Sequence, residues 1–243
     1  MNKLFLSLVL PAILAASGWA GPTKEEPMVN SLGMKFVPVP GTTILMSIWE
    51  TRVQEYMVFV NDTKVEFLER TDQQGPEFPV VSRTWDEATA FCEWLSRREG
   101  KTYRLPTDHE WSVAVGIGDR EDPKASPKDK DGKIKGVYPW GTQWPPPAGA
   151  GNYMGEREDH VSIMLSPVGR FAPNRLGIYD LGGNVWEWCE DTYEPIASSH
   201  VLRGASVSTH SPHHLLSSYR YNQAPTSWIL WSGFRCVLVV SGP

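Results

Sequence analysis

Three histidines in one short segment, His210, His213 and His214, are the residues whose types first suggest chemistry. Imidazole nitrogens suit copper(II), zinc or iron, so an atypical metal site is one interpretation of the segment. Adjacent side chains of an extended chain point in opposite directions, and no carboxylate lies close in sequence to complete a ligand set. We therefore favour an exposed polar loop and keep the three histidines as candidate ligand-binding residues.

Aromatic side chains follow the histidines within a few residues; they are Tyr219, Tyr221, Trp228 and Trp231. Tyrosine and tryptophan supply rigid, amphipathic contact area, which suits a binding surface. Residues 228–231 are all apolar, and neighbouring residues of a strand face opposite sides, so some of them are expected at the surface. Packing in the core is the alternative, and we expect it for some of the four aromatic residues.

The cysteines, Cys92, Cys189 and Cys236, are odd in number, which leaves one thiol over if a disulfide forms. Their spacing alone does not choose among the possible pairs. A formal net charge of −5 gives no basic footprint for nucleic acid, so no nucleic-acid partner is expected. A length of 243 residues suffices for one large domain with a sizeable core.

The first residues indicate export. Residues 1–20 have the pattern of a secretory signal peptide, with Lys3 before an apolar run and Gly18-Trp19-Ala20 at the expected cleavage site. A membrane anchor is less favoured, because the apolar run is shorter than the roughly 20 residues that span a bilayer. We expect a flexible leader at residues 21–29, no transmembrane segment in the mature chain, and a periplasmic, cell-surface or extracellular location.

Capping-box spacing marks three helices, because a threonine followed three residues later by Gln or Glu satisfies free backbone N–H groups. The pairs are Thr51 and Gln54, Thr84 and Glu87, and Thr107 and Glu110. They predict helices near 51–61, 84–99 and 107–116. Residues 34–39 and 233–240 are predicted strands, and the charged residues 119–136 are a predicted exposed loop.

Several segments, in a fixed order, resemble one family. They are Pro173-Asn-Arg-Leu-Gly-Ile-Tyr-Asp-Leu-Gly-Gly-Asn-Val-Trp-Glu-Trp188, which is the most specific, with Tyr103-Arg-Leu-Pro-Thr-Asp-His-Glu-Trp111, Leu202-Arg-Gly204 and Gly233-Phe-Arg-Cys236. The chain is similar in this way to the formylglycine-generating enzyme, or sulfatase-modifying factor, family over nearly all of the mature sequence. The resemblance implies one domain at residues 30–243, with an α+β variant of the C-type lectin fold and much irregular loop structure.

Active members of that family bind copper(I) through two cysteines and use oxygen to oxidise a sulfatase cysteine to formylglycine. The two cysteines lie just after a segment that matches Arg203-Gly-Ala-Ser206 here, yet no cysteine occurs between Cys189 and Cys236. Soft thiolates are what select copper(I), so we expect no copper and assign no catalytic residue.

The resemblance also implies a disulfide and calcium. Cys92 and Cys236 match two cysteines that are paired in family members, which leaves Cys189 as the odd thiol. The family's calcium sites are built from carboxylate and carbonyl oxygens, ligands that suit this hard cation. The matching residues here are Asp180, Gly183, Val185 and Glu187 for a first site, and Asn152, Tyr153, Asp159 and Val161 for a second.

Together these observations predict an exported, non-catalytic ligand-binding module on the sulfatase-modifying factor fold, stabilised by calcium, with a protein or glycan ligand. The alternative is a metal-dependent oxidoreductase of the formylglycine-generating type, which would act on a protein cysteine through a site around the three histidines. The missing cysteine pair favours the binding module.

Overall fold

Two small sheets form the framework of the computed structural model, which describes residues 21–67, 75–154, 164–195 and 198–240. The first sheet is antiparallel and has the order β1–β2–β3–β9–β4, with bounds Met28–Val29, Lys35–Pro38, Ile44–Ser47, Val237–Val239 and Thr102–Arg104. The second sheet has the order β7–β6–β5–β8, with bounds Tyr221–Gln223, His200–Arg203, Trp186–Thr192 and Ser232–Gly233. In it, only β5 and β8 run parallel.

The three predicted helices are confirmed as α1 (Val53–Thr63), α2 (Trp85–Glu99) and α3 (Asp108–Val115). Thr84 and Thr107 cap α2 and α3 as the spacing predicts, and each of these helices ends at a glycine with left-handed backbone. The predicted cap of α1 is wrong: the Arg52 N–H donates to Glu55 Oε2 at 2.6 Å. Thr51 is not free to cap, because its backbone is bonded to Val80 and Phe234.

Residues 119–136 are not simply an exposed loop, which corrects the sequence prediction. They include the last two residues of the 3-10 helix η1 (Gly118–Arg120) and the short helix α4 (Pro127–Lys130). The Lys130 ammonium lies 2.6 Å from Asp108 Oδ2 in the interior. A buried carboxylate is stable only with cationic partners, and the ion pair with Asp108 therefore keeps Lys130 and its segment in the interior.

The predicted final strand is split between the two sheets, since β8 pairs with β5 whereas β9 pairs with β3 and β4. The predicted leader also differs in part, because Met28 and Val29 form β1 against β2. The predicted signal peptide at residues 1–20 lies outside the described residues. Among the helices that are described, none has the length and apolar character needed to cross a bilayer.

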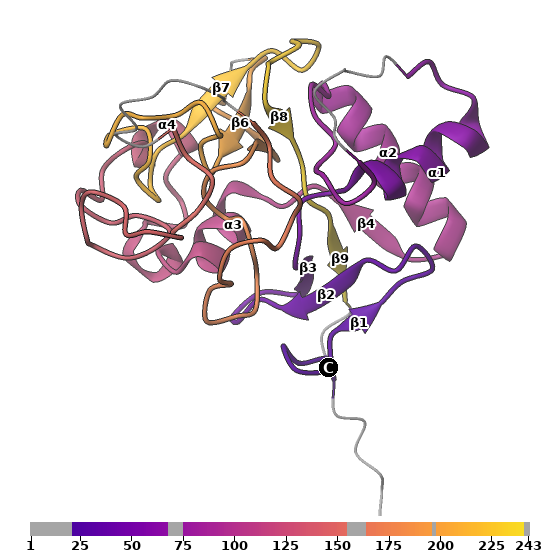
Figure 1. Cartoon of the computed structure of the whole chain (residues 1–243), viewed down its shortest axis with the longest axis horizontal. Coiled ribbons are helices and arrows are strands. Elements are labelled where there is room, and N and C mark those ends of the chain that lie inside the picture. Colours follow the sequence, from indigo (N-terminus) through magenta and orange to yellow (C-terminus); the bar gives the residue numbers. More distant parts are fainter. Residues whose placement is uncertain (1–20, 68–74, 155–163, 196–197, 241–243) are drawn as a thin grey trace, which may run out of the picture.

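The largest core cluster joins α1 and α2 to the segment between β8 and β9. Phe91 of α2 is its centre: its ring lies 5.7 Å from those of Tyr56 and Phe59 and 5.5 Å from that of Phe234. Figure 1 shows α1 and α2 on one side of the molecule, with the second sheet and the long irregular segments on the other. The fold is therefore α+β with much irregular structure, as predicted.

Candidate functional site

The segment that follows β6 is anchored on α3 by two buried arginines. Arg203, at the end of β6, donates to Ser217 O at 2.7 Å and pairs with Asp108 at the start of α3. Arg220 donates to Asp108 Oδ1 at 3.0 Å and to Ser218 O at 2.7 Å. Burial alone would raise the pKa of Asp108, but the two guanidinium groups outweigh it and hold that pKa well below the usual value. Both ends of the loop between the arginines are thus fixed.

Between these anchors, Tyr219 is the centre of a partly exposed aromatic surface. Its ring lies 5.3 Å from that of His213, 4.7 Å from that of His214 and 6.0 Å from that of Trp186 on β5. Trp186 also lies 5.5 Å from Tyr221, at the start of β7. We call these five residues the aromatic surface. Sequence reasoning had selected all of them except Trp186, which stands inside the most specific family motif.

The other two predicted aromatic residues lie elsewhere. Trp228 is 58% exposed, in the connection from β7 to β8. Trp231 is 8% exposed and packs with Val81, Val185 and Val207, so the structure places it in the core and not on a binding surface. Their different positions agree with the expectation that this apolar run has both buried and exposed members.

The three predicted histidines are exposed, and His213 and His214 lie side by side with ring centroids 5.8 Å apart. Burial lowers the pKa of His214, and the neighbouring His213 and His210 lower it further. Within the described residues, no group of three or more histidine, cysteine, aspartate or glutamate side chains is placed to hold a metal ion.

Hydroxyl groups stand in the segment where active family members carry their copper-binding cysteines. Ser206 Oγ lies 3.1 Å from Ser208 Oγ and 3.4 Å from Thr209 Oγ1. Cys189 is fully buried on β5, and burial raises the pKa of its thiol. A buried, protonated thiol is a poor nucleophile and a poor metal ligand, so Cys189 does not replace the missing pair.

Cys92 and Cys236 lie together, as the resemblance implies. Their sulfur atoms are 3.5 Å apart as free thiols, and both side chains are buried in the core cluster of α1 and α2. Burial raises the pKa of Cys92, and its hydrogen bond with Cys236 adds to the rise. The disulfide between them stays a prediction.

The first predicted calcium set is only partly available for a metal. Glu187 accepts from Arg235 Nε at 2.7 Å and from Trp111 Nε1 at 2.9 Å, so both a guanidinium and an indole already bind its carboxylate. Asp180 has a left-handed backbone, and its Oδ2 accepts from Gly169 N at 2.6 Å. The four predicted ligands therefore do not fit as one calcium site with both carboxylates free. Calcium stays a prediction.

A further carboxylate, which sequence reasoning missed, lies in the same region. Glu50 is buried, and it accepts from Asn184 Nδ2 at 2.7 Å and from Val185 N at 3.3 Å. Burial raises its pKa well above the usual value, and the nearby charges of Asp180 and Glu187 raise it further. Burial likewise raises the pKa of Asp180 to about 6. The sequence does not reveal that Glu50 lies near Asp180, because the two residues are 130 positions apart.

The second predicted calcium set falls partly outside the description, since Asp159 and Val161 are not among the described residues. Asn152 uses its amide nitrogen to bond Met164 O at 3.0 Å and Asn184 Oδ1 at 3.1 Å. The ring of Tyr153 lies 5.0 Å from that of Trp140.

Comparison with known proteins gives the family. The sulfatase-modifying factor enzyme 1-like domain matches residues 28–240. The chain belongs to this family. Over 178 residues it is 35% identical to the inactive C-alpha-formylglycine-generating enzyme 2 of Mus musculus, covering 69% of this chain and 51% of the relative. It is 29% identical to the formylglycine-generating enzyme of Streptomyces coelicolor, covering 69% of this chain and 55% of the relative. The chain thus spans about half the length of these curated relatives.

Solved structures confirm the fold of the formylglycine-generating enzyme family, the predicted variant of the C-type lectin fold. PvdO from Pseudomonas aeruginosa is similar with a TM-score of 0.59 at 23% identity, over 81% of this chain and 80% of PvdO. CarF is similar with a TM-score of 0.63 at 20% identity, over 82% of this chain and 87% of CarF. At these identities the likeness concerns the fold alone.

Proposed function

We propose that this sulfatase-modifying factor domain is a non-catalytic, exported ligand-binding module whose ligand contacts the aromatic surface. The observation that carries the proposal is the chemistry of the loop after Arg203, where Ser206, Ser208 and Thr209 supply hydroxyl groups and no thiol. Copper(I) needs soft ligands, and neutral hydroxyls are not soft. The similarity to a relative that is named inactive supports the same conclusion.

The aromatic surface supports a binding role. Trp186, Tyr219 and Tyr221 are half-buried, so their rings are held in place while part of each remains accessible. Such rings lose little conformational entropy on binding, which makes them effective contacts for a peptide or a sugar ring. The arginine anchors on Asp108 keep the loop ordered before the ligand arrives. Export, indicated by residues 1–20, would bring this surface to ligands outside the cytoplasm.

Mass spectrometry tests whether the domain is catalytic. The mature protein is incubated with a Cys-x-Pro-x-Arg peptide of the sulfatase type, copper(I), reductant and oxygen, beside an active family member as control. We expect the peptide to remain unchanged. Conversion of its cysteine to formylglycine would contradict the proposal and would direct attention to His210, His213 and His214.

Binding is tested on peptide and glycan arrays with the full chain. Trp186→Ala removes the ring that Tyr219 and Tyr221 both contact, so it is expected to weaken any ligand found by about tenfold or more, or about 1.4 kcal/mol. Trp144→Ala is the matched control, because Trp144 is 38% exposed and lies outside the aromatic surface. Equal losses in the two variants would place the binding surface elsewhere.

A further inference from the structure

A pair of polar side chains on β7 extends the aromatic surface. Gln223 Nε2 donates to the Tyr221 hydroxyl at 2.6 Å, and both side chains are partly exposed. The hydroxyl accepts this bond, so its own proton remains free to donate. Gln223 Oε1 accepts no hydrogen bond from the residues that the structure describes. The pair therefore offers one donor and one acceptor side by side, next to the ring of Trp186, which lies 5.5 Å from that of Tyr221.

A second pair of rings lies beyond Gln223. His200 on β6 is the cross-strand partner of Gln223, and its ring lies 3.9 Å from that of Trp85, with the planes at 24°. Trp85, the first residue of α2, is held in place because its Nε1 donates to Cys189 O at 2.9 Å. Cross-strand partners have Cβ atoms about 5 Å apart, so rings occur on both sides of the polar pair. We call Trp186, Tyr221, Gln223, His200 and Trp85 the ring row.

The ring row has no charged side chain at pH 8. Burial lowers the pKa of His200, which leaves its imidazole neutral at that pH. The carboxylates of Asp86 and Asp191 act on His200 by their charge, so an acidic ligand would be repelled there. Arg220, which lies between two of the surface tyrosines in the sequence, is buried and paired with Asp108 at 3.0 Å. An uncharged ligand fits this environment best.

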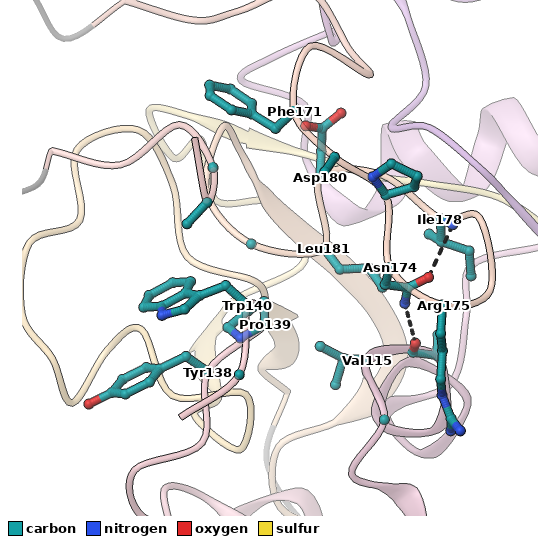
Figure 2. A pocket seen from close by; sticks show the side chains of 18 of the residues that line it. Val115, Tyr138, Pro139, Trp140, Phe171, Asn174, Arg175, Ile178, Asp180 and Leu181 are labelled. Carbon is teal, nitrogen blue, oxygen red and sulfur yellow. Dashed lines mark hydrogen bonds between the residues drawn. The ribbon is translucent and has the colours of Figure 1, made fainter. Parts of the chain in front are cut away.

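A pocket beside the end of α3 has rings of the same kind without a free polar pair. Its volume is about 530 Å³, and Figure 2 shows Tyr138 and Trp140 on one side of it and Asn174 on the other. The Asn174 side chain is bonded to Ala114 O at 2.8 Å and to Ile178 N at 3.1 Å. Its amide is thus used within the chain, and Trp140 is a suitable control for the rings of the ring row.

The short length of β7 argues against a peptide as the ligand. β7 is an edge strand of the second sheet, where a peptide would add as a further strand. It has only three residues, which gives such a peptide few backbone hydrogen bonds. A pyranose chain needs no strand edge, since the C–H faces of its rings pack on aromatic side chains and each hydroxyl both donates and accepts. Rings on both sides of a donor–acceptor pair match that pattern.

We propose that the ligand of the aromatic surface is an uncharged, β-linked pyranose chain that extends along the ring row. One sugar ring lies on Trp186, two neighbouring hydroxyls bind Tyr221 and Gln223, and a later sugar ring lies against Trp85. Pyranoses with equatorial hydroxyls have the flat C–H faces that this packing requires. The inference rests on the function proposed above and names the class of its ligand.

Calorimetry of the full chain with matched oligosaccharides tests the ligand class. The probes are cellobiose, cellohexaose and hexagalacturonate, each at pH 8 in chelator. Cellohexaose is expected to bind about tenfold more tightly than cellobiose, because only the longer chain reaches both Trp186 and Trp85. Hexagalacturonate is expected to bind about tenfold more weakly than cellohexaose, because its carboxylates have no free cationic partner in the ring row.

Two variants test the polar pair. Tyr221→Phe keeps the ring and removes the donor, and Gln223→Leu keeps the bulk and removes the acceptor, so each should weaken cellohexaose by about fivefold. Tyr179→Phe is the matched control, because it removes a hydroxyl from a tyrosine that packs against another core cluster, and it should leave the affinity unchanged.

A third variant tests the length of the site. Trp85→Ala should lower the affinity for cellohexaose to that for cellobiose and leave cellobiose binding unchanged, which also shows that the variant is folded. Trp140→Ala is the control from the pocket beside α3 and should change neither affinity.

The outcomes separate this inference from the function on which it rests. If cellohexaose does not bind, while a peptide from the array binds and is lost in Trp186→Ala, the carbohydrate class is wrong and the proposed function stands. If neither array gives a ligand, both are wrong. Equal affinities for cellobiose and cellohexaose, or unchanged binding in both Tyr221→Phe and Gln223→Leu, would overturn the binding along the ring row.

Discussion

Two buried ionic clusters in this molecule have opposite charge balances. The first, the Asp108 cluster, is joined by ion pairs and consists of Asp108, Glu121, Lys130, Arg203 and Arg220. It contains three cationic side chains and two carboxylates. The second, the Glu187 cluster, consists of Glu50, Asp180, Glu187 and Arg235, and sets three carboxylates against one cation.

The difference in charge balance shows that the Asp108 cluster stabilises the fold, whereas the Glu187 cluster retains unneutralised negative charge. In the Asp108 cluster the carboxylate has several cationic partners, and its pKa is lowered. In the Glu187 cluster the single guanidinium serves Glu187, while the pKa values of Glu50 and Asp180 are raised. The first cluster needs nothing from outside the chain. The second has more carboxylates than cations, so its net charge is negative.

The largest expected effect is on the Asp108 cluster. Asp108→Asn would leave Arg203, Arg220 and Lys130 buried without their shared carboxylate, so the free energy of unfolding should fall by about 3–5 kcal/mol. Urea unfolding followed by tryptophan fluorescence measures it. Glu194→Gln is the control, because it breaks the exposed pair with Lys128 and should leave the midpoint unchanged. A urea midpoint for Asp108→Asn equal to that of the control would contradict the stabilising role of the Asp108 cluster.

Asp180→Asn should have a smaller effect of the opposite sign. A carboxyl whose pKa is raised from 3.8 to about 6 on folding disfavours the folded state above that pH and ceases to do so as the pH falls towards 4. In chelator at pH 8 the variant should therefore be more stable than the wild type by about 1–2 kcal/mol, and the gain should shrink at pH 5. Urea midpoints at the two pH values measure it, and a loss of stability at pH 8 would mean that Asp180 has a cationic partner after all.

Calcium should give the smallest effect. Because Arg235 already binds Glu187, Asp180 Oδ1 and the carbonyl groups of Gly183 and Val185 are the predicted ligands left, so the gain in stability should be about 1 kcal/mol or less. Thermal unfolding is compared in chelator and in excess calcium, with Asp180→Asn as the variant that should lose the gain. A much larger rise in melting temperature would show that Glu187 exchanges Arg235 for the metal.

The helices could be predicted because their signals are local in the sequence. The strands were harder to predict, because their pairing joins distant parts of the chain. Thr84 and Thr107 mark their helices because a cap needs only the next three residues. The strand predicted at residues 233–240 is present in part but divided into β8 and β9, and this division depends on pairing with β3 and β5, which come from distant parts of the chain. The actual cap of α1 was missed for the same reason, because Thr51 bonds to Phe234.

The candidate site shows the same limit. Tyr219 and Tyr221 could be selected from their own segment, but their contact with Trp186 depends on the pairing of β5, β6 and β7. The sequence could not place Trp231 in the core, because the alternation of side chains along a strand does not tell which face of the strand is buried. The pocket beside the end of α3 could not be predicted from the sequence, since separate segments of the chain form its walls.

The division of residues 232–239 between the sheets has a consequence for the order of folding. β9 lies between β3 and β4 in the first sheet, and β8 forms an edge of the second. During synthesis neither sheet is complete until these residues have left the ribosome, by which time β1 to β7 have long been exposed. Such long-range closure makes folding slow and late, because the loop entropy is lost before the pairing compensates for it. The two sheets therefore close together and late, once residues 232–239 can pair with both of them.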